Sequence, residues 1–142
     1  MLHFIIASHG QLASALISSA NMVFGELGNT TAICLTEEGG IEQFKQDFHH
    51  EITAIAPTVD GIVVLCDLEC GTPYNVACTY AFNPDFNPKV EVITGVNFPT
   101  LLMTADFIEE KDASIVANNL QQEALKTVVV AKPIELVEED DF

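Results

Sequence analysis

The sequence predicts an α/β protein: a doubly wound, mainly parallel five-stranded sheet with helices on both faces. Three observations lead to this prediction. Short apolar runs alternate along the chain with segments whose apolar residues recur at helical spacing. Clusters of glycine, proline and polar residues separate the two kinds of segment. The run 61–66 is apolar at consecutive positions, which is typical of a central parallel strand covered on both faces.

The expected strands are the five short apolar runs. The first one ends at His9, and Gly10 directly after it lets the backbone turn tightly into a helix. The last one is closely followed by Pro133, which favours an edge strand that breaks the parallel pattern as an antiparallel element. The five runs are residues 4–9, 31–35, 61–66, 90–96 and 127–131.

The expected helices each carry an apolar stripe or a recognisable start. Thr72 before Pro73 offers a capping hydroxyl and a proline at the first helical position. Asn97 opens another helix, and Asp112 is the N-cap of the last one. Three stripes are predicted: Leu12, Leu16, Ala20 and Val23 in residues 11–24; Ile41, Phe44, Phe48, Ile52 and Ile55 before Pro57; Ile115, Leu120 and Leu125 in residues 112–126. Two further helices are expected over residues 74–82 and 100–108.

A chain of 142 residues fits one domain, which we place at residues 1–133, followed by an acidic tail at 134–142. It holds 21 acidic residues and five lysines, and no arginine. This charge repels nucleic acid and anionic membranes and favours basic protein partners. Any phosphate site must use backbone N–H groups, hydroxyls or lysine. No apolar run approaches the roughly 20 residues of a membrane helix, and no secretion signal is visible, so we expect a cytoplasmic protein.

The cysteines and most of the histidines favour structural over chemical roles. Cys34 and Cys66 lie in apolar runs and are expected to be small buried hydrophobes. A zinc site could combine Cys66, Cys70 and a histidine, but no C-x-x-C spacing occurs, and we predict no metal and no cofactor. His49 and His50 are expected on the solvent face of their helix.

Two strand ends carry titratable side chains, His9 after the first strand and Asp67 after the third. If these strands are neighbours at the switch point of the sheet, the carboxylate can bind one imidazole nitrogen and leave the other free as a nucleophile. A helix N-terminus at Thr72 could then bind phosphate oxygens. The same pair fits a hydrolase dyad, although Ser8 lacks the G-x-S-x-G elbow.

Three segments at three strand ends resemble the IIA component of mannose-family sugar phosphotransferase systems. They are Ile5-Ile6-Ala7-Ser8-His9-Gly10, Leu65-Cys66-Asp67-Leu68-Glu69-Cys70-Gly71-Thr72-Pro73-Tyr74-Asn75 and Ile93-Thr94-Gly95-Val96-Asn97-Phe98-Pro99. Their order and spacing agree with the family from residue 1 to about residue 133. One departure is Glu69-Cys70-Gly71, where mannose-specific members often have tryptophan-glycine-glycine or similar. This departure affects the expected sugar class and leaves the phosphoryl chemistry unchanged.

The resemblance implies a phosphoryl carrier with a phosphohistidine intermediate. His9 would accept the phosphoryl group at its tele nitrogen from the phosphocarrier protein HPr and pass it to the IIB component, driving uptake and phosphorylation of a sugar or sugar acid. Asp67 would orient the ring, and Thr72 would contact the phosphate, with Gly71, Ser8 and Gly10 beside it. The resemblance also implies peripheral association with the membrane transporter, and a homodimer in which the last strand is exchanged.

Three alternatives remain open from the sequence. A receiver-like module would be phosphorylated on Asp67, which also ends a central strand. A noncatalytic regulatory module would keep the fold and bind a partner through its acidic face. A phosphodonor subunit for a glycerone kinase would use the same fold with another acceptor. The sequence does not name the transported sugar, because the IIA component never contacts it.

Overall fold

Strand β1 (Leu2–His9) lies in the middle of a parallel four-stranded sheet with the order β2-β1-β3-β4. The other strands are β2 (Thr30–Leu35), β3 (Gly61–Cys66) and β4 (Lys89–Ile93). The structure is a computed structural model and describes residues 1–133. It confirms the predicted α/β class and the parallel pairing of the first four strands.

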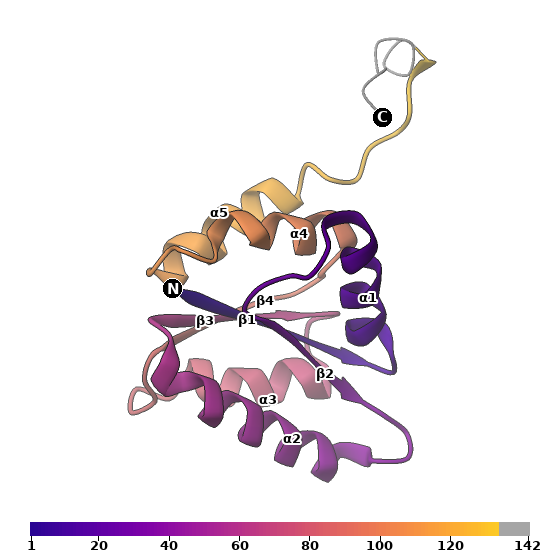
Figure 1. Cartoon of the computed structure of the whole chain (residues 1–142). Coiled ribbons are helices and arrows are strands. Elements are labelled where there is room, and N and C mark those ends of the chain that lie inside the picture. Colours follow the sequence, from indigo (N-terminus) through magenta and orange to yellow (C-terminus); the bar gives the residue numbers. More distant parts are fainter. Residues whose placement is uncertain (134–142) are drawn as a thin grey trace.

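Within the described residues, five α-helices cover the two faces of the sheet (Figure 1). Helices α2 (Gly40–Ile55) and α3 (Thr72–Ala81) lie on one face. Helices α1 (Leu12–Phe24), α4 (Phe98–Met103) and α5 (Ala113–Ala124) lie on the other. Short 3₁₀ helices follow α2 at Ala56–Thr58 and α4 at Thr104–Phe107. Within residues 1–133, no helix combines the length and the apolar character that crossing a bilayer requires.

Strand β1 contributes to both layers of the core because its side chains alternate between the two faces. Phe4 and Ile6 pack under α1, α4 and α5, whereas Ile5 and Ala7 pack against α2 and α3. All four are completely buried. Burial of a large apolar side chain stabilises a fold by roughly 1.5–3 kcal/mol, so this strand is strongly fixed in register.

Two of the predicted helix starts are confirmed by their caps. The side chain of Asn97 accepts a hydrogen bond from the Thr100 N–H, and that of Asp112 accepts from the N–H groups of Ser114 and Ile115. The predicted cap at Thr72 is displaced by one residue. Gly71 is the N-cap of α3 and Thr72 is its first helical residue.

The predicted apolar stripes are only partly right. In α2, the stripe residues after the first are buried as predicted, but Ile41 is 51% exposed. In α1, Ala13 and Ala20 are the fully buried residues, whereas Leu12 and Val23 are exposed. In α5, Leu120 is buried but Ile115 and Leu125 are exposed. The helical period was correct, while the angular position of the buried face was shifted in α1 and α5.

The predicted fifth strand, expected to pair with another subunit, is not seen in the single chain. Residues 127–131 form no strand, and Val128, Val129 and Val130 are largely exposed. Thr127 is held in place by a 2.7 Å hydrogen bond from Asn97 Nδ2 to its hydroxyl. An isolated extended segment has nowhere to satisfy its backbone groups except in water or against another strand. The predicted acidic tail, residues 134–142, lies outside the described residues.

The strand order creates a switch point between β1 and β3. The connection from β1 through α1 leads to β2 at one side, and the connection from β3 through α3 leads to β4 at the other. Helices α1 and α3 also lie on opposite faces of the sheet (Figure 1). The carboxyl ends of two such strands open a crevice in which ligands of this fold class bind.

Candidate active site

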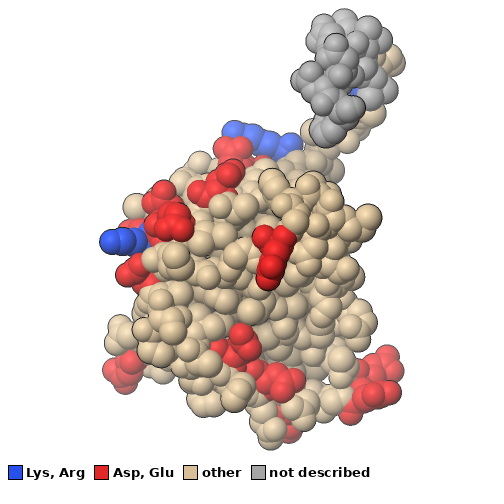
Figure 2. Space-filling model, viewed as in Figure 1, with Lys and Arg blue, Asp and Glu red and all other residues tan. Residues whose placement is uncertain are grey.

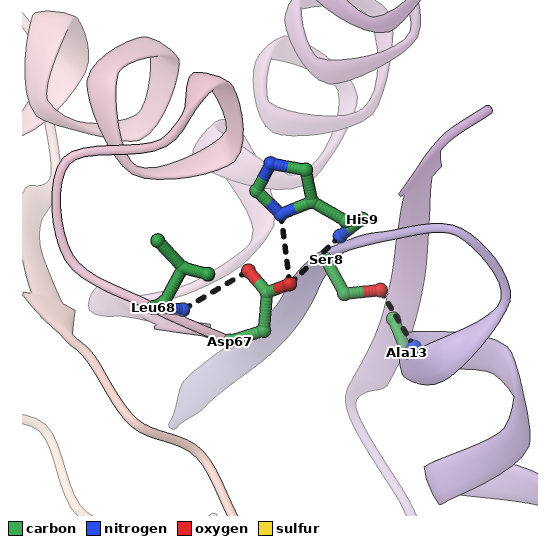
Figure 3. A network of polar contacts seen from close by, with 5 residues as sticks. All are labelled: Ser8, His9, Ala13, Asp67 and Leu68. Carbon is green, nitrogen blue, oxygen red and sulfur yellow. Dashed lines mark hydrogen bonds and ion pairs between the residues drawn. The ribbon is translucent and has the colours of Figure 1, made fainter. Parts of the chain in front are cut away.

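His9 and Asp67 meet at this switch point. His9 is the last residue of β1, and Asp67 directly follows β3, whose Cys66 is paired with Ala7. The imidazole Nδ1 of His9 lies 2.9 Å from Oδ2 of Asp67 (Figure 3). The two strand ends therefore lie next to each other, as predicted. The predicted contact between the two side chains is also confirmed.

The backbone fixes the carboxylate of Asp67 at both oxygens. Oδ2 also accepts a hydrogen bond from the backbone N–H of His9 at 2.9 Å, and Oδ1 accepts one from the N–H of Leu68 at 3.0 Å. The Asp67 side chain is only 10% exposed, whereas that of His9 is 44% exposed. An ionised carboxylate accepts hydrogen bonds only, so Nδ1 carries the proton and Nε2 presents its lone pair.

The free edge of the imidazole lies against the start of α3. A Cβ atom built on Gly71 would stand 2.6 Å from Cε1 and 3.2 Å from Nε2 of His9. A side chain larger than hydrogen fits here only if the His9 ring moves away. Nε2 therefore lies beside a helix N-terminus, where the partial positive charge of the helix and unpaired N–H groups favour an anion.

The first turn of α3 offers backbone N–H groups from Thr72 and Tyr74, because Pro73 has none. Within residues 1–133, the Thr72 side chain makes no capping hydrogen bond at the start of α3, which leaves its hydroxyl available to a ligand.

Ser8 and Gly10 shape the turn after β1. Gly10 has φ +58, and its N–H donates to the Leu35 carbonyl at 2.7 Å, so the turn needs a residue that tolerates the left-handed region. Ser8 is completely buried, and its hydroxyl accepts a hydrogen bond from the Ala13 N–H at 2.7 Å. In Figure 3 the Ser8 side chain points to the start of α1 and away from Asp67. The Ser8 hydroxyl thus stabilises the start of α1, and its role in phosphate binding stays a prediction.

The cysteines near the site do not build a metal centre. Burial, together with the neighbouring Asp67 charge, raises the pKa of the Cys66 thiol to about 12, and Cys70 is exposed in the loop before α3. A protonated thiol is a poor zinc ligand. Among residues 1–133, no three His, Cys, Asp or Glu side chains are grouped as a metal site would require. His49 and His50 are exposed on α2 as predicted, and His49 Nδ1 lies 2.8 Å from the Tyr80 hydroxyl.

Two features of the site were not predicted. The Leu68 N–H contact to Asp67 comes from the backbone, which has no residue signature. The contact of Gly71 with the ring could be suspected only from a glycine that precedes Thr-Pro at a helix start.

Comparison with known proteins gives one consistent family. The model of the EIIA-man family, described as "PTS system fructose IIA component", matches residues 3–121. The sorbose-specific EIIA component of Klebsiella pneumoniae is 31% identical over 140 residues, covering 99% of both chains. The fructose-specific EIIA component of Bacillus subtilis is 31% identical over 121 residues, covering 85% of this chain and 80% of that protein.

Solved structures agree with this result. A mannose/sorbose-specific IIA subunit from Enterococcus faecalis superposes with a TM-score of 0.79 at 25% identity, covering 92% of this chain and 94% of that one. A IIA protein associated with the fucose utilisation operon of Streptococcus pneumoniae has a TM-score of 0.75 at 27% identity, covering 91% and 92%. The chain therefore belongs to the mannose, sorbose and fructose family of EIIA components, the phosphoryl carriers of sugar phosphotransferase systems.

Proposed function

We propose that His9 is the phosphoryl acceptor of this carrier, that it receives the group from HPr, and that it passes the group to a IIB component. One observation carries the proposal. The His9 Nδ1 contact with Asp67 at 2.9 Å leaves Nε2 as the nucleophile, and Nε2 lies at the N-terminus of α3. A positioned nucleophile, an orienting carboxylate and an anion-binding helix end are together suited to phosphoryl transfer.

The transfer exchanges one N–P bond for another. The Nε2 lone pair of His9 forms a bond to phosphorus while the bond from phosphorus to the donor imidazole breaks and its electron pair returns to that ring. The His9 ring then carries a positive charge, which Asp67 stabilises through the hydrogen bond from Nδ1–H. The reverse sequence, with an attacking group of the IIB component, releases the phosphoryl group.

The phosphate itself would be bound without arginine, since the chain contains none. The N–H groups of the first turn of α3 and the hydroxyl of Thr72 supply neutral donors beside Nε2. Neutral donors offset the repulsion between the phosphate and Asp67 less than a guanidinium would. The phosphoryl group is therefore held less tightly and can still be transferred.

The geometry also disfavours phosphorylation of Asp67. Both carboxylate oxygens accept hydrogen bonds from His9 or Leu68, and the side chain is nearly buried. A receiver-like site would need an accessible carboxylate oxygen, whereas His9 contacts Oδ2 and the Leu68 N–H contacts Oδ1 (Figure 3).

The test is to incubate the protein with phosphoenolpyruvate, enzyme I and HPr and to map the phosphorylated residue by mass spectrometry. We expect an acid-labile, base-stable label on His9, absent from His9→Ala and retained in His49→Ala and His50→Ala. Label on Asp67, His49 or His50 would refute the assignment. Addition of a IIB component should then discharge the label.

We further propose that the protein is a homodimer in which residues 127–131 of each subunit pair with the other subunit. Strand β4 is an edge of the four-stranded sheet, and no strand within residues 1–133 pairs with its outer side. A hollow of about 290 Å³ lies beside it, lined by Glu91, Val92 and Ile93 of β4, by Tyr74 of α3 and by residues of α5. An exposed extended segment with three valines matches the needs of this free edge.

A further inference from the structure

The side chain of Asn97 joins two segments that lie far apart in the sequence. Asn97 precedes α4, and its Nδ2 donates a 2.7 Å hydrogen bond to the hydroxyl of Thr127, which follows α5. Both side chains are half-buried. Asn97 belongs to the segment after β4 that the proposed phosphoryl transfer does not use. Its contact with Thr127 therefore needs an explanation of its own.

The orientation of the Asn97 amide is fixed by Thr100. The Asn97 Oδ1 accepts hydrogen bonds from the Thr100 N–H at 3.0 Å and from the Thr100 hydroxyl at 2.5 Å. Thr100 is 1% exposed, so both of its donors need a partner inside the protein. Because the oxygen of the amide faces Thr100, its NH₂ group must point the other way, toward Thr127. One amide thus caps α4 and holds Thr127 at the same time.

Thr127 is also held by the end of α5. Its backbone N–H donates to the Ala124 carbonyl at 3.0 Å, and its hydroxyl donates to the same carbonyl at 2.7 Å. The hydroxyl proton is used in this bond, so the oxygen can accept the hydrogen bond from Asn97. Three hydrogen bonds therefore fix Thr127 in the single chain. The residues that follow, Val128 to Val130, are largely exposed.

The chain leaves its own subunit at Thr127. Residues 127–133 run away from the sheet and its helices (Figure 1). Within the described residues, β4 pairs with β3 alone, so this segment does not return to the free edge of its own sheet. A segment that leaves in a fixed direction is available to the free edge of another subunit.

We propose that the hydrogen bond between Asn97 and Thr127 positions residues 127–131 for dimer formation. It directs this segment out of its own subunit and orders its first residue before the segment pairs with β4 of the other subunit. The inference rests on the homodimer proposed above. A segment that is ordered in advance loses less conformational entropy on binding, so it associates more tightly.

The charge of the protein makes this ordering important. The chain has a formal net charge of −16, and the viewed face carries more acidic than basic side chains (Figure 2). Two copies therefore repel each other as they approach. The contacts made by residues 127–131 must outweigh this repulsion together with the entropy lost when the segment is ordered. The bond from Asn97 reduces the second of these costs.

The test measures the dimer dissociation constant by sedimentation over a dilution series. Thr127→Val keeps the shape of the side chain and removes the hydroxyl that accepts from Asn97. We expect the dissociation constant to rise by at least about tenfold, because a dimer contains two such bonds and each contributes about fivefold. Thr127→Ser retains the hydroxyl and should dimerise with nearly the wild-type constant.

Thr58→Val is the matched control. The Thr58 hydroxyl donates at 2.7 Å to the carbonyl of Ile55, three residues earlier at a helix end, as the Thr127 hydroxyl does to Ala124. This variant loses the same kind of helix-end bond without the asparagine contact, so its dissociation constant should match the wild type.

Asn97→Ser tests the other partner. Serine can still cap α4, but its shorter side chain does not reach Thr127. We expect this variant to weaken the dimer as much as Thr127→Val does. The double variant should be no weaker than either single variant, because both substitutions remove the same hydrogen bond.

The outcomes separate this inference from the proposed dimer. If the wild type is a dimer and Thr127→Val dissociates no more readily, the positioning role is refuted and the dimer stands. If Thr58→Val weakens the dimer as much, or the effects of Asn97→Ser and Thr127→Val add, local helix stability causes the loss and the inference is again refuted. A wild-type monomer at micromolar concentration would overturn the dimer and this inference together.

Discussion

Gly71 touches the imidazole edge of His9 so closely that a Cβ atom at Gly71 would lie 2.6 Å from Cε1. Gly71 has φ −97 and ψ 175, a conformation open to any residue, so glycine is not needed there for its backbone. Glycine is needed at this position because a larger residue would take the space of the His9 ring. The ring is thus confined between Asp67 on its Nδ1 side and the backbone of Gly71 on its Cε1–Nε2 side.

We predict that Gly71→Ala displaces the His9 ring without unfolding the protein. The added methyl cannot coexist with the observed ring position, and His9 is exposed enough to rotate away. Rotation would break the contact between Nδ1 and Asp67, so transfer from phospho-HPr should fall by at least about tenfold. Nitrogen-15 NMR of the imidazole should show loss of the single Nδ1–H tautomer.

The control for this variant is Gly95→Ala, at a loop glycine with φ +71 and open space around it. It should strain the backbone and leave the His9 tautomer unchanged. A Gly71→Ala protein with the wild-type NMR spectrum and transfer rate would show that the ring is not confined as described.

We predict that Asp67→Ala slows transfer severely, by about 100-fold or more, because the partner that sets the tautomer and stabilises the charged ring is lost. Thr72→Ala should cost about 1–3 kcal/mol, the value of one hydrogen bond to a charged group. Rapid-quench measurement of transfer from phospho-HPr compares the two variants. If Thr72→Ala is the more damaging, or Asp67→Ala transfers at the wild-type rate, the assigned roles are wrong.

Most of the chemistry-bearing residues could be placed from the sequence because they sit at strand ends. His9 and Asp67 follow two apolar runs, and parallel strands bring their carboxyl ends to the same edge of a sheet. Ser8 could not be assigned in the same way. Neighbours in a strand point to opposite faces, so the hydroxyl beside His9 faces the start of α1.

The errors concern contacts that lie outside a single segment. Ile41 fits the apolar period of α2. The period does not reveal, however, whether neighbouring elements cover the first turn of the helix. Residues 127–131 have strong strand propensity, but the edge with which they are predicted to pair belongs to a second subunit, so the single chain shows no strand there.

We predict that His3 makes the fold sensitive to moderate acid. His3 is 8% exposed, and its Nε2 lies 3.0 Å from the Thr31 hydroxyl. Burial lowers the pKa of His3 from 6.5 to about 4. Between these values the unfolded chain binds the proton and the folded chain does not, so stability is complete above about pH 6.5 and decreases as the pH falls toward 4.

The folded and unfolded chains differ in the number of protons bound at His3. Integrating this difference from pH 7.5 to pH 5 gives a loss of about 2 kcal/mol in the free energy of unfolding. Urea titrations at the two pH values measure it. His3→Gln keeps a hydrogen-bonding group without a titrating ring, so it should lose about 2 kcal/mol less than the wild type over the same interval. Equal losses in both proteins would mean that other groups cause the acid sensitivity.

Finally, we predict that replacing Val128, Val129 and Val130 together by aspartate converts the proposed dimer into a monomer. These valines are largely exposed in the single chain, and each would contribute roughly 1.5 kcal/mol if buried against another subunit. Loss of three such contributions per subunit raises the dissociation constant well above the micromolar range. The folded core should be unaffected, because Thr127 and its bond to Asn97 are retained.

Light scattering after size exclusion at about 10 µM should give a dimer for the wild type and a monomer for the triple variant. Leu125→Asp is the control, since Leu125 is exposed just before the segment and lies outside it. It should remain dimeric. A wild-type monomer would refute the dimer, whereas a triple variant that stays dimeric would refute only the pairing through residues 127–131, since the contact between subunits must then lie elsewhere.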